Sequence, residues 1–291
     1  MPGWYLGVIG GSGLYDIEGL EDPGWTKVES PFGAPSDDIL TGRLGHAKLA
    51  FLPRHGRGHP LSPTAVNFRA NIDALKRLGV TDVLSLSAVG SLRESLAPGD
   101  FVIVDQYVDR TYAREKSFFG PGLAAHVSMA KPVCPRLSAL AATAARAAGA
   151  RAVEGGCYLV MEGPQFSTEA ESALYRSWGC DVIGMTNMPE AKLAREAELP
   201  YASVAMVTDY DCWHEEFAHV EVSHILEVLE ANAGRARELV RRLALALPAE
   251  RPPSPIDRAL EGAIITAPGA RDPALAARLE AVAGRALEAS R

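Results

Sequence analysis

Apolar and polar positions divide the chain into two kinds of segment. Seven short apolar runs are bounded by Gly, Pro, Asp or Ser, which is the pattern of buried strands. Between them lie stretches whose apolar residues recur at helical spacing. The expected strands cover residues 5–9, 47–53, 82–86, 101–104, 157–161, 181–185 and 201–207, and the expected helices cover 66–78, 135–148, 168–178, 190–198 and 222–245. Strands that alternate with helices predict a single α/β domain, in which helices flank a mixed, mostly parallel central sheet.

The last long helix ends at the segment RPPSPID, residues 251–257. A short apolar patch, AIITAP, and a closing Ala-rich helix follow it. We therefore expect a main domain over residues 1–250 and a C-terminal tail over residues 251–291. The tail is either a flexible appendage or a packed segment, and its apolar residues favour packing on the same domain or on a neighbouring subunit.

Composition narrows the classes of function. The 291 residues are 47% hydrophobic and 22% charged, and the net charge of −7 argues against non-specific nucleic-acid binding. No run approaches the roughly 20 apolar residues of a membrane span, and the first residues show no basic n-region followed by an apolar h-region, so we expect neither a membrane span nor a targeting segment. The four cysteines are widely spaced, so we expect free thiols rather than disulfides or a zinc site. These features predict a cytoplasmic protein that contacts neither nucleic acid nor membrane.

The stretch GVIGGSGLYD, at residues 7–16, is typical of a strand that enters a glycine turn. A dinucleotide fingerprint would need a third glycine where Asp16 stands, and no P-loop pattern occurs in the chain. Two interpretations of the turn remain open. Its backbone N–H groups and the Ser12 hydroxyl form an anion cradle, or the turn holds no ligand.

Two further strand ends carry groups that bind anions. LPRHGRGHP follows one strand and supplies Arg54 and His55, and the Arg fork matches phosphate oxygens. LSLSAVGSL follows another and supplies Ser87. Ligands of open α/β sheets bind where strands end, so the convergence of these groups favours a site for a small anion over a solvated basic loop.

The stretch VTDYDCWHE contains a pair of carboxylates. Asp209 and Asp211 face the same way if their strand stays extended. Two close carboxylates repel each other, so one of them can stay protonated and act as a general acid. The alternative is a pair of loop or helix-capping aspartates. The nearby HEEFAH lacks metal-ligand spacing, and we predict no metal site.

Several of these stretches together resemble one family. GVIGGSGLYD, PRHGRGH, VNFRANIDALKRLG, SAVGSLRESLAPGD, EGPQFSTEAE, GMTNMPEAKLARE and VTDYDCW occur in the order and spacing of the 5′-methylthioadenosine phosphorylases, which belong to the trimeric purine nucleoside phosphorylase class. The resemblance runs from about residue 5 to residue 245. It implies the nucleoside phosphorylase fold and a homotrimer whose site lies near the subunit interface. It also implies attack of phosphate on the anomeric carbon of a nucleoside, with inorganic phosphate as co-substrate and no cofactor.

The resemblance also assigns residues to parts of the site. It implies that Asp209 hydrogen-bonds the purine N7 and helps to protonate the leaving base, with Asp211 near the 6-amino group. One departure is Gly184, which stands where animal members carry Asn and so removes a side chain near the sugar. The implied phosphate-binding residues are Ser12, Arg54, His55, Ser87, Ala88 and Thr186, and the implied nucleoside-binding residues are Phe166, Met185, His59, Val222, Ile225 and, from the neighbouring subunit, His126.

Three other functions compete with phosphorolysis of methylthioadenosine. A phosphorylase of 6-oxopurine nucleosides or of methylthioinosine typically carries Asn in the region of the acid pair, so Asp209 and Asp211 argue against it. A nicotinamide-dependent dehydrogenase would need the missing third glycine. A non-catalytic nucleoside-binding or scaffold protein would not need an intact Asp209, Arg54 and His55.

Overall fold

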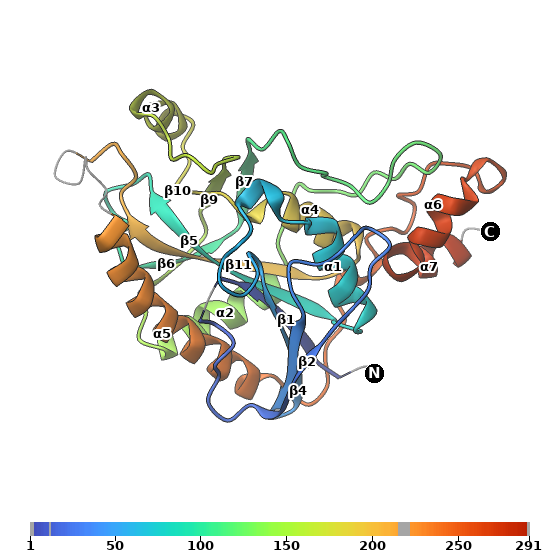
Figure 1. Cartoon of the computed structure of the whole chain (residues 1–291), viewed down its shortest axis with the longest axis horizontal. Helices are drawn as coiled ribbons and strands as arrows, with labels where there is room; N and C mark the ends of the chain where they lie inside the picture. The colour runs from blue at the N-terminus through green and yellow to red at the C-terminus, as the bar shows by residue number, and fades with distance from the viewer. Residues whose placement is uncertain (1–2, 12, 215–221, 290–291) are drawn as a thin grey trace.

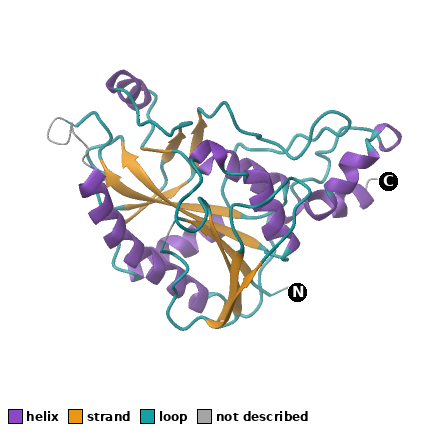
Figure 2. Ribbon diagram, viewed as in Figure 1, coloured by secondary structure: helices purple, strands orange, loops and turns teal. Residues whose placement is uncertain are grey.

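The computed structural model describes residues 3–11, 13–214 and 222–289, and for residues 222–227 it describes the backbone alone. Over these residues eleven strands form one sheet, and helices cover both of its faces (Figures 1 and 2). The predicted α/β class, with a mixed and mostly parallel sheet, is therefore confirmed.

Four parallel strands form the centre of the sheet. β4 (Ala47–Pro53), β1 (Tyr5–Gly10), β5 (Asp82–Ser91) and β11 (Tyr201–Asp209) lie side by side in this order, and each neighbouring pair is parallel. Their carboxyl ends therefore meet at one edge. β5 runs five residues beyond the predicted end at residue 86, and this extension carries Ser87 to the same edge.

Shorter strands extend this centre on both sides. β10 (Val182–Gly184) pairs antiparallel with β5, and β6 (Phe101–Val104) pairs antiparallel with β11. Four strands were not predicted from the sequence. They are β2 (Glu21–Thr26), β3 (Ile39–Leu44), β7 (Gln106–Asp109) and β8 (Ala152–Glu154), while the predicted β9 (Cys157–Val160) and β10 are confirmed with shorter bounds.

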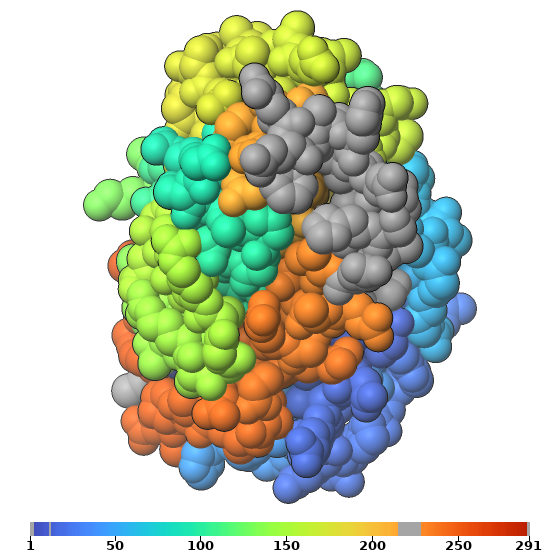
Figure 3. Space-filling view, turned by 90° about the vertical axis from the view of Figure 1, so that its left-hand side faces the viewer, coloured from blue at the N-terminus to red at the C-terminus, as the bar shows by residue number. Residues whose placement is uncertain are grey.

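The two faces of the sheet bury separate apolar clusters because side chains alternate along a strand. Val8 of β1 belongs to the cluster under α2 (Pro135–Ala147) and α5 (Val222–Ala246), whereas Ile9 belongs to the cluster under α1 (Phe68–Arg77) and α4 (Asn187–Glu196). α3 (Glu169–Ser177) lies at the upper left of Figure 1 and at the top of the face seen in Figure 3, and its Tyr175 shares a small buried cluster with Leu159 of β9 and Ile183 of β10. All five predicted helices are confirmed to within three residues at each end.

The C-terminal tail lies against the helical face that carries α1. Its expected closing helix is two helices, α6 (Pro273–Arg278) and α7 (Glu280–Ala289), and Leu260, Leu279 and Val282 join the apolar cluster of the sheet. A long excursion over residues 110–134 runs beside these helices at the right of Figure 1. No helix within the described ranges is both long and apolar enough to cross a membrane.

Candidate functional site

A cavity of about 630 Å³ opens at the edge where the central parallel strands end. Because β1, β4, β5 and β11 run in one direction, the residues that follow them converge there. The site therefore draws on segments that are far apart in the sequence. The predicted site residues that line this cavity are Arg54, His55, His59, Ser87, Ala88, Phe166, Met185, Thr186, Asp209 and Asp211.

Four predicted residues are not found in the lining. Ser12 lies outside the described residues, and Val222 and Ile225 fall in the part of α5 described by its backbone alone. His126 is exposed on the 110–134 excursion, where its backbone N–H donates to Ala263 O at 2.9 Å. His126 of the same chain therefore lies away from the cavity.

Arg54 is buried beneath the cavity and most of its guanidinium is engaged by the protein. Nε and Nη2 donate to the two carboxylate oxygens of Glu190 at 2.8 and 3.1 Å. Nη2 also donates to Ser85 Oγ at 2.7 Å, and Nη1 donates to Leu86 O at 3.1 Å. Burial works against the charge, but Glu190 outweighs it and raises the guanidinium pKa. The expected bidentate fork toward phosphate is thus closed on Glu190, which leaves one N–H of Nη1 without a bond in the described part of the chain.

The other basic residues of the PRHGRGH motif have different surroundings. The His55 ring stacks on His59 with centroids 4.3 Å apart, and its Nδ1 lies 2.9 Å from Leu61 O. Burial, followed by the charge of Arg54, lowers the pKa of His55 to about 4, so the ring is neutral at physiological pH. Arg57 lies outside the cavity lining. It forms an ion pair with Asp37 at 2.7 Å, and its guanidinium lies over the Trp25 ring at 4.1 Å.

Three polar side chains meet where β5 approaches the start of α4. Ser87 Oγ donates to Asn187 Oδ1 at 3.0 Å, and Asn187 is fully buried. Thr186 is 8% exposed, and its Oγ1 is buried without a hydrogen-bond partner among the described atoms. Native proteins rarely leave such a group unpaired, so this hydroxyl indicates a ligand that supplies an acceptor.

The two carboxylates approach each other by a turn and not by an extended strand. β11 ends at Asp209, and Asp211 has a positive φ of 52°, so the expectation of one extended strand across both residues is wrong. Asp209 Oδ1 accepts from the Asp211 N–H at 2.8 Å, and Asp209 Oδ2 accepts from Thr208 Oγ1 at 2.7 Å. Burial, with a further contribution from the charge of Asp209, raises the pKa of Asp211. The pair is therefore able to hold a proton inside the cavity.

The apolar wall of the cavity was largely missed from the sequence. Leu14, Met206, Leu229 and Ala233 line it. Leu14 belongs to the GVIGGSGLYD stretch but was not predicted as a site residue, and the other three stand in no recognisable motif. One signal was available in α5, because Ile225, Leu229 and Ala233 recur every four residues and so share one helix face.

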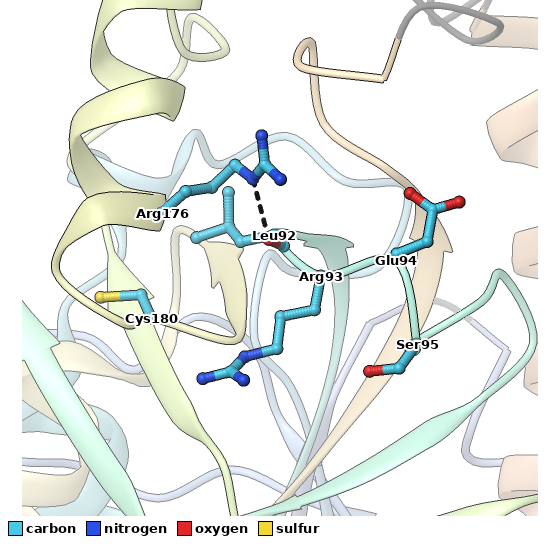
Figure 4. Close-up of a pocket in the computed structure, with 6 residues that line it drawn as sticks. All are labelled: Leu92, Arg93, Glu94, Ser95, Arg176 and Cys180. Carbon is cyan, nitrogen blue, oxygen red and sulfur yellow. Dashed lines mark hydrogen bonds between the residues drawn. The ribbon is translucent and has the colours of Figure 1, made fainter.

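A second hollow, of about 430 Å³, lies between the end of β5 and α3 (Figure 4). Its two arginines are already paired. Arg93 forms an ion pair with Asp181, while Arg176 donates to Leu92 O at 3.2 Å and lies 3.7 Å from the centre of the Trp213 ring. Figure 4 shows the two guanidinium groups pointing apart, so they do not form an anion cradle.

The described residues contain no group of three or more His, Cys, Asp or Glu side chains suited to a metal ion. All four cysteines, Cys134, Cys157, Cys180 and Cys212, are free, as predicted.

Comparisons with known proteins agree with this geometry. The model of the "Phosphorylase superfamily" matches residues 5–245. The S-methyl-5'-thioadenosine phosphorylase of Cereibacter sphaeroides is 66% identical over 285 residues, covering 97% of this chain and 98% of that protein. The S-methyl-5'-thioadenosine phosphorylase of Rhodospirillum rubrum is 61% identical, covering 97% of each.

Solved structures show the same likeness. A methylthioadenosine phosphorylase from an antarctic soil metagenomic library superposes with a TM-score of 0.91 at 45% identity, covering 97% of this chain and 99% of that one. A variant of the adenosine/methylthioadenosine phosphorylase of Schistosoma mansoni, in complex with methylthioadenosine, gives a TM-score of 0.79 at 39% identity, covering 85% and 93%. With its strand-end cavity and these relatives, the chain belongs to the phosphorylase superfamily, and within it to the S-methyl-5'-thioadenosine phosphorylases.

Proposed function

We propose that this protein catalyses the phosphorolysis of S-methyl-5′-thioadenosine to adenine and 5-methylthioribose 1-phosphate, in purine and methionine salvage. The observation that carries the proposal is one cavity lined both by a protonatable carboxylate pair and by buried hydroxyl groups with the Arg54 guanidinium. Relatives of the same length that carry this activity in their names support it.

The phosphate end of the proposed site lies at Arg54, His55, Ser87, Ala88 and Thr186. Among the described residues, one N–H of Arg54 Nη1 and the Thr186 hydroxyl have no partner, and both supply hydrogen-bond donors. Arg54 also supplies positive charge, part of which the Glu190 carboxylate offsets. We assign Ser12 to the same phosphate-binding group only because the GVIGGSGLYD stretch resembles that of the family. These residues hold the phosphate so that one of its oxygens attacks the anomeric carbon while the bond from that carbon to the purine N9 breaks.

The purine end lies at the carboxylate pair. The departing base gains electrons at the imidazole ring, and protonation at N7 neutralises it. We propose that Asp209 faces N7 and that the proton comes from the pair it forms with Asp211, whose raised pKa favours its protonated form. Asp211 then lies near the exocyclic 6-amino group.

The sugar and its 5′ substituent occupy the apolar part of the cavity. Phe166 and Met185 flank the nucleoside, and Leu14, Met206 and Leu229 form a wall suited to a methylthio group. Phe166 is 67% exposed, so the cavity is open on one side in the single chain. We propose a homotrimer in which the partner subunit's His126 closes this side, and that the enzyme works in the cytoplasm without metal or organic cofactor.

A substrate panel tests the proposal. Methylthioadenosine, adenosine, inosine and methylthioinosine are incubated with the enzyme in the presence and absence of inorganic phosphate. We expect adenine from methylthioadenosine only when phosphate is present, with adenosine as a slower substrate, because an apolar pocket rejects a hydroxyl only modestly. Faster turnover of inosine or methylthioinosine would assign the enzyme to 6-oxopurines instead. No turnover of any nucleoside would favour a non-catalytic binding protein.

A further inference from the structure

Tyr158 is a fully buried tyrosine whose hydroxyl lies against Gly184, a residue of the cavity lining. It lies on β9 opposite Val182 of β10, and its ring leans along β10 toward Gly184, two residues further on the same face. Its hydroxyl is buried and has no hydrogen-bond partner among the described atoms. The Thr186 hydroxyl is also buried without a partner among the described atoms, so the site has two such hydroxyls near its phosphate end.

Gly184 is the residue that lets the phenol reach this position. A Cβ added at Gly184 would overlap Tyr158 Oη and would lie 2.8 Å from Tyr158 Cζ. The φ of Gly184 is not one that requires glycine, so the reason for glycine here is this close approach. Tyr158 and Gly184 are thus one structural unit, in which a ring fills the space that a side chain at position 184 would take.

The groups around the Tyr158 oxygen indicate which part of the site it contacts. Burial raises the pKa of Tyr158, and the hydroxyls of Ser87 and Thr186 and the charge of Arg54 act in the opposite direction, so the oxygen lies among the phosphate-end residues. The group stays protonated and is therefore a donor. Ser87 gives its own proton to Asn187, which leaves Thr186 as the hydroxyl with a proton still free.

We propose that Tyr158 is a positioning residue for phosphate, which acts through Thr186. When phosphate binds, the Tyr158 hydroxyl donates to Thr186 Oγ1, and the Thr186 proton is thereby directed to a phosphate oxygen. Both buried hydroxyls become paired, which removes the penalty of an unpaired buried polar group. Tyr158 itself does not line the cavity, so it orients a contact without making one. The proposal rests on the proposed function only in taking phosphate as the anion.

Steady-state kinetics of Tyr158→Phe test this step. Loss of one neutral hydrogen bond predicts a rise of about 3- to 10-fold in the KM for phosphate. The KM for methylthioadenosine and kcat at saturating phosphate stay near the wild-type values. The matched control is Tyr107→Phe, because Tyr107 pairs with Tyr158 in register and also carries a buried hydroxyl without a partner among the described atoms. Its hydroxyl lies near Ser203 and Tyr201, whereas that of Tyr158 lies near Ser87 and Thr186 at the phosphate end. An unchanged KM for phosphate in Tyr158→Phe overturns the proposal.

A double-mutant cycle tests the route through Thr186. In a Thr186→Ala background, Tyr158→Phe should have no further effect on the KM for phosphate, because the hydroxyl that it orients is gone. The same fold-change in both backgrounds would show that Tyr158 acts independently, and the proposal would be wrong. Gly184→Ala displaces the phenol without altering it, so it should reproduce the rise seen in Tyr158→Phe, and this variant keeps the test open if Tyr158→Phe folds poorly.

A binding measurement separates this inference from the proposed activity. Inorganic phosphate should raise the Tm of the wild-type protein, and a higher phosphate concentration should be needed for the same rise in Tyr158→Phe. This readout needs no nucleoside. If the wild type turns over no nucleoside but the two proteins still differ in their response to phosphate, the proposed activity fails and the positioning role stands. Identical responses overturn the positioning role.

Discussion

Arg54 and Arg57 belong to one short motif but have opposite environments. Arg54 is 1% exposed and is matched by a carboxylate that is equally buried, Glu190. The Arg57 side chain is 45% exposed and pairs with Asp37 at the surface. A buried charge that loses its partner destabilises a fold strongly, whereas a surface pair contributes little.

We predict that Arg54→Ala lowers the free energy of unfolding by about 3–5 kcal/mol, because Glu190 would be left buried without its counter-charge. Chemical denaturation monitored by circular dichroism measures this change. Arg57→Ala is the control and should leave the midpoint close to that of the wild type. A purely phosphate-binding role for Arg54 would instead leave the midpoint unchanged and raise only the KM for phosphate.

Asp209→Asn removes the ability of the pair to carry a proton to the leaving purine. We expect kcat to fall by about 10²- to 10⁴-fold, the usual contribution of a general acid, with little change in Tm. The matched control is Asp38→Asn, because the Asp38 side chain is 41% exposed and lies outside the cavity lining. Turnover near the wild-type rate in Asp209→Asn would contradict the proposed proton transfer.

At the scale of elements, the central strands of the sheet were predictable from the sequence, whereas several outer strands were not. The central strands are continuous apolar runs, so they are recognisable without context. β2 reads EDPGWT, is exposed along nearly its whole length and contains both Pro and Gly, so it has no strand pattern and exists because β3 offers it a partner.

Some residues of the candidate site were likewise predictable from the sequence and others were not. Residues at the ends of central strands were predictable because strand direction brings them together. The closure of the Arg54 fork on Glu190 was not, because Glu190 reads as an ordinary residue of a helix that is distant in the sequence. Leu229 and Tyr158 likewise read as plain core positions, since nothing local says that one lines the cavity and the other lies behind it.

The 110–134 excursion is attached to α4 by a buried carboxylate that titrates near neutral pH. Ser117 Oγ and Phe118 N–H each donate to Glu196 at 2.7 Å. Burial raises the pKa of Glu196 to about 7, above the value of an unfolded chain, although these hydrogen bonds oppose the shift. The folded state therefore holds the proton more tightly than the unfolded state does.

This shift predicts a pH-dependent contribution of Glu196 to stability. It is fully present below about pH 4.5 and is lost as the pH rises through about 7, because the unfolded chain ionises first. Tm measured between pH 5 and 8 should therefore decline with pH less steeply in Glu196→Gln than in the wild type. Parallel curves for the two proteins would show that Glu196 does not carry this dependence.

At the scale of the whole molecule, the C-terminal tail shares the core of the sheet. Arg251 forms an ion pair with the fully buried Asp82 at the start of β5, and its guanidinium also pairs with Asp257 at 2.7 Å. Arg285 of α7 pairs with Glu198, which follows α4. We propose that residues 251–291 fold together with residues 1–250 as one cooperative unit.

Leu279→Ala tests this cooperativity. Leu279 is fully buried in the cluster that also contains residues of β1 and α1, so the substitution should lower the free energy of unfolding by about 2–5 kcal/mol. We expect one unfolding transition, shifted as a whole, when fluorescence and circular dichroism are followed together. Leu275→Ala, at a partly buried position of α6, should shift it less. A new early transition, with the main one unmoved, would show that the tail unfolds by itself.

The orientation of the His55 ring has a consequence for which oxyanions can enter. Nδ1 lies within hydrogen-bond distance of the Leu61 carbonyl oxygen, so it carries the single proton of the neutral imidazole and Nε2 carries a lone pair. A lone pair attracts an anion that still bears an O–H group and repels one that bears none. Inorganic phosphate keeps at least one proton at neutral pH and sulfate keeps none. The site should therefore distinguish two tetrahedral anions of nearly equal size, and sulfate should compete with phosphate only at concentrations far above the KM for phosphate.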